Sequence, residues 1–148
     1  AAVAMARTYS NYLPVWKVAE APDFQAGGSV DIDANGKFVS FPISSSVQHV
    51  EKVFVLVNLF TRNAGASGAT CNQIELTSPA GTRSILLNAA NGFQNAILDS
   101  VLLSSNAFYG ENPNGTWKMT VFDWCGSVPV TPTRYSLLKP QEFALIGH

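Results

Sequence analysis

Two histidines, His49 and His148, are the side chains of this sequence best suited to act as a general base near neutral pH. A serine hydrolase needs a serine, a histidine and an acid that converge on one another. The sequence contains no Gly-x-Ser-x-Gly nucleophile elbow, His148 is the last residue, and His49 directly precedes an apolar stretch that begins at Val50. We therefore expect no catalytic residue in this chain.

The segment from Asp31 to Gly36 alternates oxygen-bearing side chains and matches the start of a calcium-binding loop. Asp31, Asp33 and Asn35 would supply the ligands, and the glycine would allow the sharp turn. Position twelve of such a loop is Pro42 instead of glutamate. The competing interpretation is a turn with two solvated aspartates. We expect no required cofactor, and calcium is the ion that this pattern leaves open.

Glu111 and Asp123 are a second candidate pair of cation ligands, although we favour hydrogen bonds from backbone or turn groups to their carboxylates. Asn114-Gly115-Thr116 is an acceptor sequence for N-glycosylation. Its Asn-Gly dipeptide also marks a turn, and the turn is the interpretation that we favour.

Cys71 and Cys125 are the two cysteines of the chain, which excludes a four-cysteine zinc site. A single disulfide and two buried thiols both remain open. We favour the disulfide, because both residues lie in polar segments that contain glycine. Such a bond would stabilise the fold by about 4 kcal/mol in the chain-entropy model and would indicate an oxidising compartment.

The composition indicates a globular domain. Hydrophobic residues make up 47% of the 148 residues and charged residues 13%, which is too apolar for a disordered chain. Gly, Pro, Asn and Ser interrupt every apolar run, so we expect no membrane span. The net charge is −1 without a basic cluster, which argues against a nucleic-acid partner. Because the chain opens on Ala1 without a leader-like segment, we expect it to be a piece of a longer protein.

The first residues, Ala1 to Tyr12, are rich in alanine and end before Pro14, which predicts one short helix. A helix of this length is marginal in isolation and must dock on something to persist. An extended connector through Trp16 to Pro22 follows, and we expect a domain boundary at its end.

From about Ser29 onward, apolar residues alternate with a period of two between turn dipeptides. Asn35-Gly36 predicts a hairpin between the strands that flank it. The nearly continuous apolar run Val50–Phe60 predicts a central strand covered on both faces. Residues 88–108 show neither period and predict covering loops with one short strand.

These signals predict an all-β fold, an antiparallel β-sandwich resembling a jelly roll, with one short N-terminal helix. The predicted strands are Ser29–Asp33, Lys37–Ile43, Val50–Phe60, Ile74–Thr77, Arg83–Leu87, Thr116–Asp123, Arg134–Leu138 and Glu142–Ile146.

Two segments of the chain have distinctive motifs. In the segment 107–123, a Gly-Glu pair and a spacer precede Gly-Thr-Trp and an alternating strand that ends in Asp. In the segment 74–86, a strand meets a Ser-Pro-x-Gly-Thr turn and a returning strand. Both segments resemble sequence blocks of the P domains found in kexin-like and bacterial subtilisin-like serine proteases. The residues that carry the resemblance are Pro79, Gly81, Thr82, Gly110, Glu111, Gly115, Thr116, Trp117 and Asp123.

The resemblance implies a structural role for these blocks. Pro79 and Gly81 set the turn, while Trp117, Met119 and Val121 share one strand face and belong in the core. The end of the chain, Phe143 to Gly147, is similar to the last strand of the family, and residues 1–9 are similar to the final helix of subtilisin-like catalytic domains. The implied organisation is a helix and linker over residues 1–22 and a P domain over residues 23–148.

The function implied by the resemblance is that of a secreted, non-catalytic domain. It would pack on the subtilisin-like catalytic domain of the same polypeptide, which is its expected partner, and stabilise or regulate it. The sequence departs from the family where a Gly/Ala/Ser-rich insertion ends at Cys71, and where the loop after Asp123 is long. A crosslink between Cys71 and Cys125 would explain both departures.

Trp16, Tyr109 and Trp124 support an alternative function, an appended module that binds carbohydrate or another polymeric substrate. Exposed aromatic side chains on a β-sandwich bind sugars by stacking. Packing of these three residues in the core or an interface is the interpretation that we favour.

Overall fold

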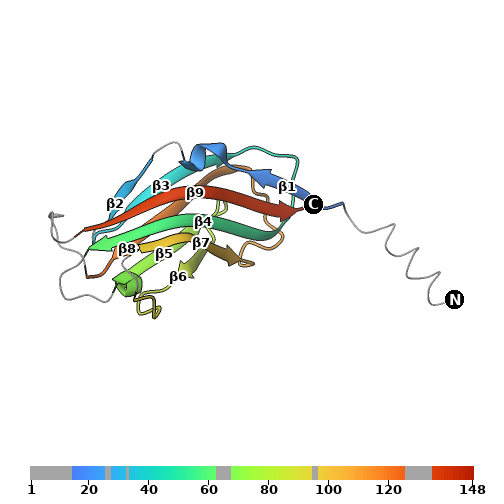
Figure 1. Cartoon of the computed structure of the whole chain (residues 1–148). Helices are drawn as coiled ribbons and strands as arrows, with labels where there is room; N and C mark the ends of the chain where they lie inside the picture. Colours follow the sequence, from blue (N-terminus) through green and yellow to red (C-terminus); the bar gives the residue numbers. More distant parts are fainter. Residues whose placement is uncertain (1–14, 26–27, 33, 63–67, 95–96, 126–134) are drawn as a thin grey trace.

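The computed structural model describes residues 15–25, 28–32, 34–62, 68–94, 97–125 and 135–148. The helix predicted for Ala1 to Tyr12 lies outside these ranges, which contain no helix long and apolar enough to cross a bilayer. The elements that they form (Figure 1) are β1 (Lys17–Glu20), the 3-10 helix η1 (Pro22–Gln25), β2 (Val30–Ile32), β3 (Lys37–Ile43), β4 (Val50–Arg62), the 3-10 helix η2 (Gly68–Cys71), β5 (Asn72–Thr77), β6 (Arg83–Leu87), β7 (Ile97–Ser105), β8 (Gly115–Asp123) and β9 (Tyr135–Gly147).

The strands form two antiparallel sheets that pack face to face, which confirms the predicted β-sandwich (Figure 1). The first sheet has five strands in the order β1-β9-β4-β7, with β2 also pairing along β9. The second has four strands in the order β3-β8-β5-β6. Each sheet turns one face toward the other and its outer face away from the core.

The central strands β4 and β9 show how the sequence pattern builds the core. Val53, Val55, Val57 and Leu59 of β4 point toward the second sheet and are buried, as their alternation predicts. The outer-face residues of β4, represented by Phe54, are only half-buried. The prediction that this strand is covered on both faces is therefore wrong, because the described residues supply a second layer on one side alone.

An aromatic cluster fills the middle of the sandwich. Phe41 of β3 lies between Phe24 of η1, with ring centroids 4.9 Å apart, and Phe143 of β9, with centroids 4.7 Å apart. Trp117 of β8 continues the cluster, at 5.4 Å from Phe143 and 5.0 Å from Phe108. All five side chains are fully buried, so the cluster joins both sheets and the segment before β8.

The hairpin predicted at Asn35-Gly36 is wrong. β2 pairs with β9 in the first sheet, whereas β3 pairs with β8 in the second, so this turn carries the chain from one sheet to the other. The Asn-Gly dipeptide indicates only that the backbone adopts positive φ at this turn, as Gly36 does with φ 81°. It does not determine which strands pair on either side. A side chain at Gly36 would also lie 2.5 Å from the Phe122 ring.

The last two predicted strands are one continuous strand, β9. Pro140 lies inside it, at a shift in the register between β4 and β9. On the other edge of β9, β2 pairs as far as Leu138 and β1 pairs from Ala144 onward. Pro140 therefore falls at a register shift on one side of β9 and between the two paired segments on the other, which is the kind of position at which a sheet tolerates proline.

Residues 88–108 contain a nine-residue strand, β7, longer than the short strand predicted for this region. A register shift opposite Asn58 interrupts its pairing with β4. Ser100 has φ 55° there, and its N–H donates to Asn58 Oδ1 at 2.8 Å. This bulge obscures the two-residue period in the sequence. Residues 17–20, placed in the linker by the sequence, form β1 and pair with β9.

Candidate functional site

The Ser-Pro-x-Gly-Thr turn between β5 and β6 is built as its residue types suggest. The N–H of Ser78 donates to Thr82 O and the N–H of Gly81 donates to Ser78 O, both at 2.9 Å. Gly81 has φ 92°, a conformation that favours glycine. The turn reverses the chain between two paired strands of the second sheet.

The two sequence blocks meet at this turn. Gly115, the first residue of β8, has φ 134°, and a Cβ added to it would lie 2.8 Å from Pro79 Cβ. Glycine is therefore required at position 115 by a close approach as well as by backbone conformation. Two segments that resemble one family separately in the sequence form one corner of the sandwich.

Glu111 is the polar link in this corner. Its Oε1 accepts a hydrogen bond from Thr82 Oγ1, and its backbone O accepts from Val50 N–H at 2.9 Å. The neighbouring Gly110 N–H donates to Val50 O at 2.7 Å. The Gly-Glu pair thus joins the β5–β6 turn to the start of β4, which is a structural role for the family signature.

Replacing Thr82 by Val should lower the free energy of unfolding by about 1 to 3 kcal/mol, because it removes the hydroxyl donor to the Glu111 carboxylate and nearly preserves side-chain volume. Urea unfolding of the 148-residue chain measures this change. Thr116→Val, at an exposed position of β8, is the matched control and should cost less than about 0.5 kcal/mol. Equal losses in the two variants would contradict the role given to Glu111.

The remaining residues of the two blocks are also placed in the fold. Trp117, Met119 and Val121 are buried, as predicted, and Trp117 Nε1 donates to Pro113 O at 2.8 Å. Thr116 is exposed beside them. Asp123 is buried at the end of β8 and accepts a hydrogen bond from the Cys125 N–H at 3.1 Å.

Glu111 and Asp123 lie toward opposite ends of β8, so the structure does not bring them together as a cation pair. Each carboxylate accepts a turn hydrogen bond, as we expected. The Asn114 amide is also engaged: its Oδ1 accepts from Ser45 N–H at 2.7 Å and its Nδ2 donates to Val47 O at 3.3 Å. This geometry agrees with the turn interpretation of Asn114-Gly115-Thr116.

The predicted calcium loop is only partly described. Asp31 and Asn35 are exposed, and Asp33 lies outside the described residues. Across the described ranges, no group of three or more His, Cys, Asp and Glu side chains is arranged to hold a metal ion. Calcium binding at this loop stays a prediction.

Cys71 and Cys125 form a disulfide with their Cα atoms 5.6 Å apart. The bond joins the end of η2 to the segment after β8, beside a hydrogen bond from Trp124 N–H to Cys71 O at 3.1 Å. Of the two options that the sequence left open, the disulfide is the one present.

The two histidines lie near each other, with ring centroids 5.6 Å apart. His49 Nδ1 is 3.1 Å from Gly110 O, and His148 Nδ1 is 3.3 Å from Glu51 Oε1. Within the described residues, neither histidine has a hydrogen bond to a serine. The geometry offers no nucleophile–base pair here, and the absence of catalysis stays a prediction for the chain.

The three aromatic residues proposed as a sugar platform are exposed, so the prediction that they pack in the core is wrong, and their packing in an interface stays a prediction. They also do not form one surface. Trp16 precedes β1, which pairs with the end of β9, and Tyr109 lies near the start of β4. Trp124 directly follows β8 and lies at the opposite end of the sandwich, beside Cys71.

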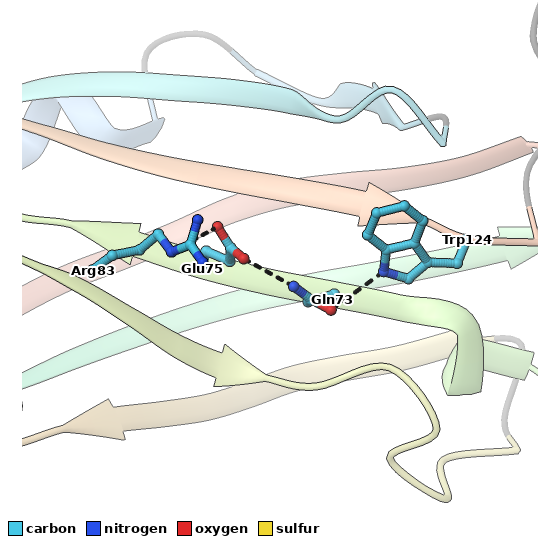
Figure 2. A network of polar contacts seen from close by, with 4 residues as sticks. All are labelled: Gln73, Glu75, Arg83 and Trp124. Carbon is cyan, nitrogen blue, oxygen red and sulfur yellow. Dashed lines mark hydrogen bonds and ion pairs between the residues drawn. The ribbon is translucent and has the colours of Figure 1, made fainter.

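Trp124 belongs instead to a row of side chains on the outer face of the four-stranded sheet (Figure 2). Its ring stacks on Phe122 with centroids 5.0 Å apart and an interplanar angle of 5°. Its Nε1 donates to Gln73 Oε1 at 3.3 Å, and Gln73 Nε2 donates to Glu75 Oε1 at 2.9 Å. Glu75 Oε2 lies 3.7 Å from Arg83 Nε. We call these five residues the aromatic–polar platform.

The sequence analysis missed Gln73, Glu75 and Arg83. The two-residue period of β5 does place Gln73 and Glu75 on the face opposite Ile74, so their shared orientation could have been found. Their neighbours could not, because Phe122 comes from β8 and Arg83 from β6, and strand pairing is needed to bring them together.

The fold places this chain in the class of antiparallel β-sandwich domains. Its two sequence blocks meet at Pro79 and Gly115, and Gly110 and Glu111 connect this corner to β4 of the other sheet. The family model described as the proprotein convertase P-domain matches residues 50–137, more than half of the chain. The chain belongs to this family.

Similar proteins point the same way. The Aeromonas extracellular serine protease of Aeromonas sobria is 44% identical over a segment that covers 34% of this chain and 10% of that protein. The crystal structure of the A. sobria serine protease matches 96% of this chain and 29% of its own, with a TM-score of 0.63 and 21% identity. The structure of the same protease with the chaperone ORF2 gives a TM-score of 0.60 at 23% identity, over 97% of this chain and 29% of its own. The structural likenesses establish the shared fold.

Proposed function

We propose that this P domain docks on the subtilisin-like serine endopeptidase domain of the same polypeptide and stabilises it, without contributing a catalytic residue. Membership of the P-domain family and the serine protease relative support this proposal. The chain spans 10% of the curated relative and 29% of the similar solved chains. A protease domain would therefore lie outside these 148 residues.

The outer face of the five-stranded sheet is the observation that carries the proposal. Phe54, Leu56, Leu102, Glu142 and Ala144 line a groove across β7, β4 and β9. Leu102 is 63% exposed at its edge. The apolar surface continues along the sheet through Val18 and Ile146, which pair across β1 and β9. Exposed apolar side chains gathered in a groove are typical of an interaction site.

The position of β1 supports a preceding protease domain as the occupant of this face. β1 is the first described strand, it is the edge strand of the same sheet, and Val15 and Trp16 directly before it are exposed. A protease domain that precedes β1 in the polypeptide would therefore be tethered at the edge of this sheet. A domain tethered there has a high effective concentration at this surface, which favours docking.

Leu102→Asp in the parent protease should shorten its half-life at elevated temperature several-fold. It places a charge in the proposed interface and removes a Leu side chain whose burial on docking would be worth about 1.5 to 3 kcal/mol. Ile85→Asp is the matched control, since Ile85 is 50% exposed on the outer face of the other sheet. Both variants of the isolated chain should unfold at similar urea concentrations. Equal half-lives of the two protease variants would contradict docking through this face.

We also propose that the protein is secreted. The curated relative is an extracellular protease, and the disulfide between Cys71 and Cys125 is a bond that persists in oxidising compartments.

A further inference from the structure

The aromatic–polar platform lies on the opposite side of the sandwich from the proposed docking face, so docking would leave it open to solvent. Gln73 and Glu75 come from β5, Arg83 from β6 and Phe122 from β8, and Trp124 directly follows β8. Figure 2 shows four of these five side chains. The described part of the chain gives the platform no role in the core: Trp124 is 52% exposed, and the Arg83 side chain is 65% exposed.

The indole of Trp124 is held in place. One ring face packs in parallel on Phe122, and its Nε1 is fixed by Gln73. Trp124 is nevertheless 52% exposed, so much of the remaining indole surface is open to solvent. A flat, fixed indole offers a stacking surface that loses little conformational entropy when a ligand binds.

The polar side chains beside the indole are also pre-arranged. Gln73 is held between Trp124 and Glu75, and the buried Glu75 carboxylate holds the Nε side of Arg83. The terminal amino groups of Arg83 remain as donors on an exposed side chain. Amide, carboxylate and guanidinium groups therefore lie in a row beside the indole. Because Arg83 pairs with Thr77, the row extends along β5 from Gln73 to Thr77, a length of about 13 Å.

We propose that the aromatic–polar platform binds carbohydrate, with one sugar ring stacked on Trp124 and the hydroxyls of neighbouring rings bonded to Gln73 and Arg83, which Glu75 holds in place. The apolar C–H face of a pyranose fits the electron-rich indole face, and its hydroxyls need both donors and acceptors. The length of the row favours a chain of sugars over a single ring.

Other polymers fit this surface less well. An extended peptide binds by adding a strand to a sheet edge, whereas the platform crosses β8 and β5, whose backbone groups are already paired with each other. A nucleic acid needs a basic surface, and the platform pairs its one cation with a carboxylate.

Sedimentation of the 148-residue chain with chitin, microcrystalline cellulose and starch granules tests the proposal. The chain is then titrated with the six-sugar oligosaccharide of whichever polymer binds it. Trp124→Ala should weaken binding roughly tenfold, since ring stacking contributes up to about 1.5 kcal/mol beyond area burial. Arg83→Ala should weaken it about three- to tenfold through lost hydrogen bonds. Trp16→Ala is the matched control, because Trp16 is 62% exposed at the other end of the molecule and should bind as the unaltered chain does.

Gelatin serves as the protein control. The proposal is overturned if the unaltered chain sediments with none of the three polysaccharides, or if it sediments with gelatin alone. Equal binding by the Trp124 and Trp16 variants would overturn it as well. Thermal unfolding of each variant shows whether it folds. If Trp124→Ala does not fold, Arg83→Ala still tests the site. None of these outcomes depends on docking to a protease domain.

Discussion

Replacing Trp117 by Ala should lower the free energy of unfolding by about 3 to 5 kcal/mol, the range for removing a buried Trp side chain. Trp117 is 0% exposed and contacts both Phe108 and Phe143, so its loss would leave a cavity between the two sheets. The substitution also leaves Pro113 O without its hydrogen-bond donor, which adds to the cost.

Urea unfolding of the 148-residue chain measures this loss, with Trp16→Ala as the control that removes an exposed indole. The control should change stability by less than about 0.5 kcal/mol. A loss below about 1 kcal/mol for Trp117→Ala would be incompatible with an aromatic cluster that joins the sheets.

Removing the disulfide should have the next largest effect. Cys71 and Cys125 are separated by 54 positions, and closing a loop of this length is worth about 4 kcal/mol in the chain-entropy model. The double variant Cys71→Ala, Cys125→Ala should therefore lose about 2 to 4 kcal/mol.

The measurement compares urea unfolding of this variant with that of the oxidised and the reduced unaltered chain. The reduced chain should behave like the variant, and the oxidised chain should be more stable than both. If all three unfold at the same urea concentration, the crosslink does not contribute to stability.

Local signals predicted much of the fold. The strands Lys37–Ile43 and Arg83–Leu87 have the bounds that were expected from the sequence, because alternation and the flanking turns are local properties of the chain. The turn at Pro79 to Gly81 was predicted for the same reason. The burial of Trp117 follows from the two-residue period of β8.

Strand pairing could not be predicted in the same way. Asn35-Gly36 specifies positive φ, but whether the chain makes a hairpin or changes sheets depends on β8 and β9, which follow far along the sequence. The bond between Thr82 and Glu111 and the stacking of Trp124 on Phe122 likewise depend on contacts between segments. The aromatic–polar platform was missed because it is assembled by pairing of β8, β5 and β6.

The sandwich also presents two unlike outer faces. The five-stranded sheet exposes Leu102 and the apolar groove, while the four-stranded sheet exposes the aromatic–polar platform. Docking of the first face would leave the second available, so one domain could both stabilise a protease and hold it near a polymer.

The central claim is that this domain docks on a protease domain of the same polypeptide and stabilises it. The most direct test is the thermal unfolding of the parent protease with and without residues 15–148, a deletion that removes β1 together with the rest of the sandwich. The account predicts that the shortened protease unfolds at least about 5 °C lower, as expected for an interface worth a few kcal/mol. Equal unfolding temperatures, with equal half-lives of activity, would contradict it.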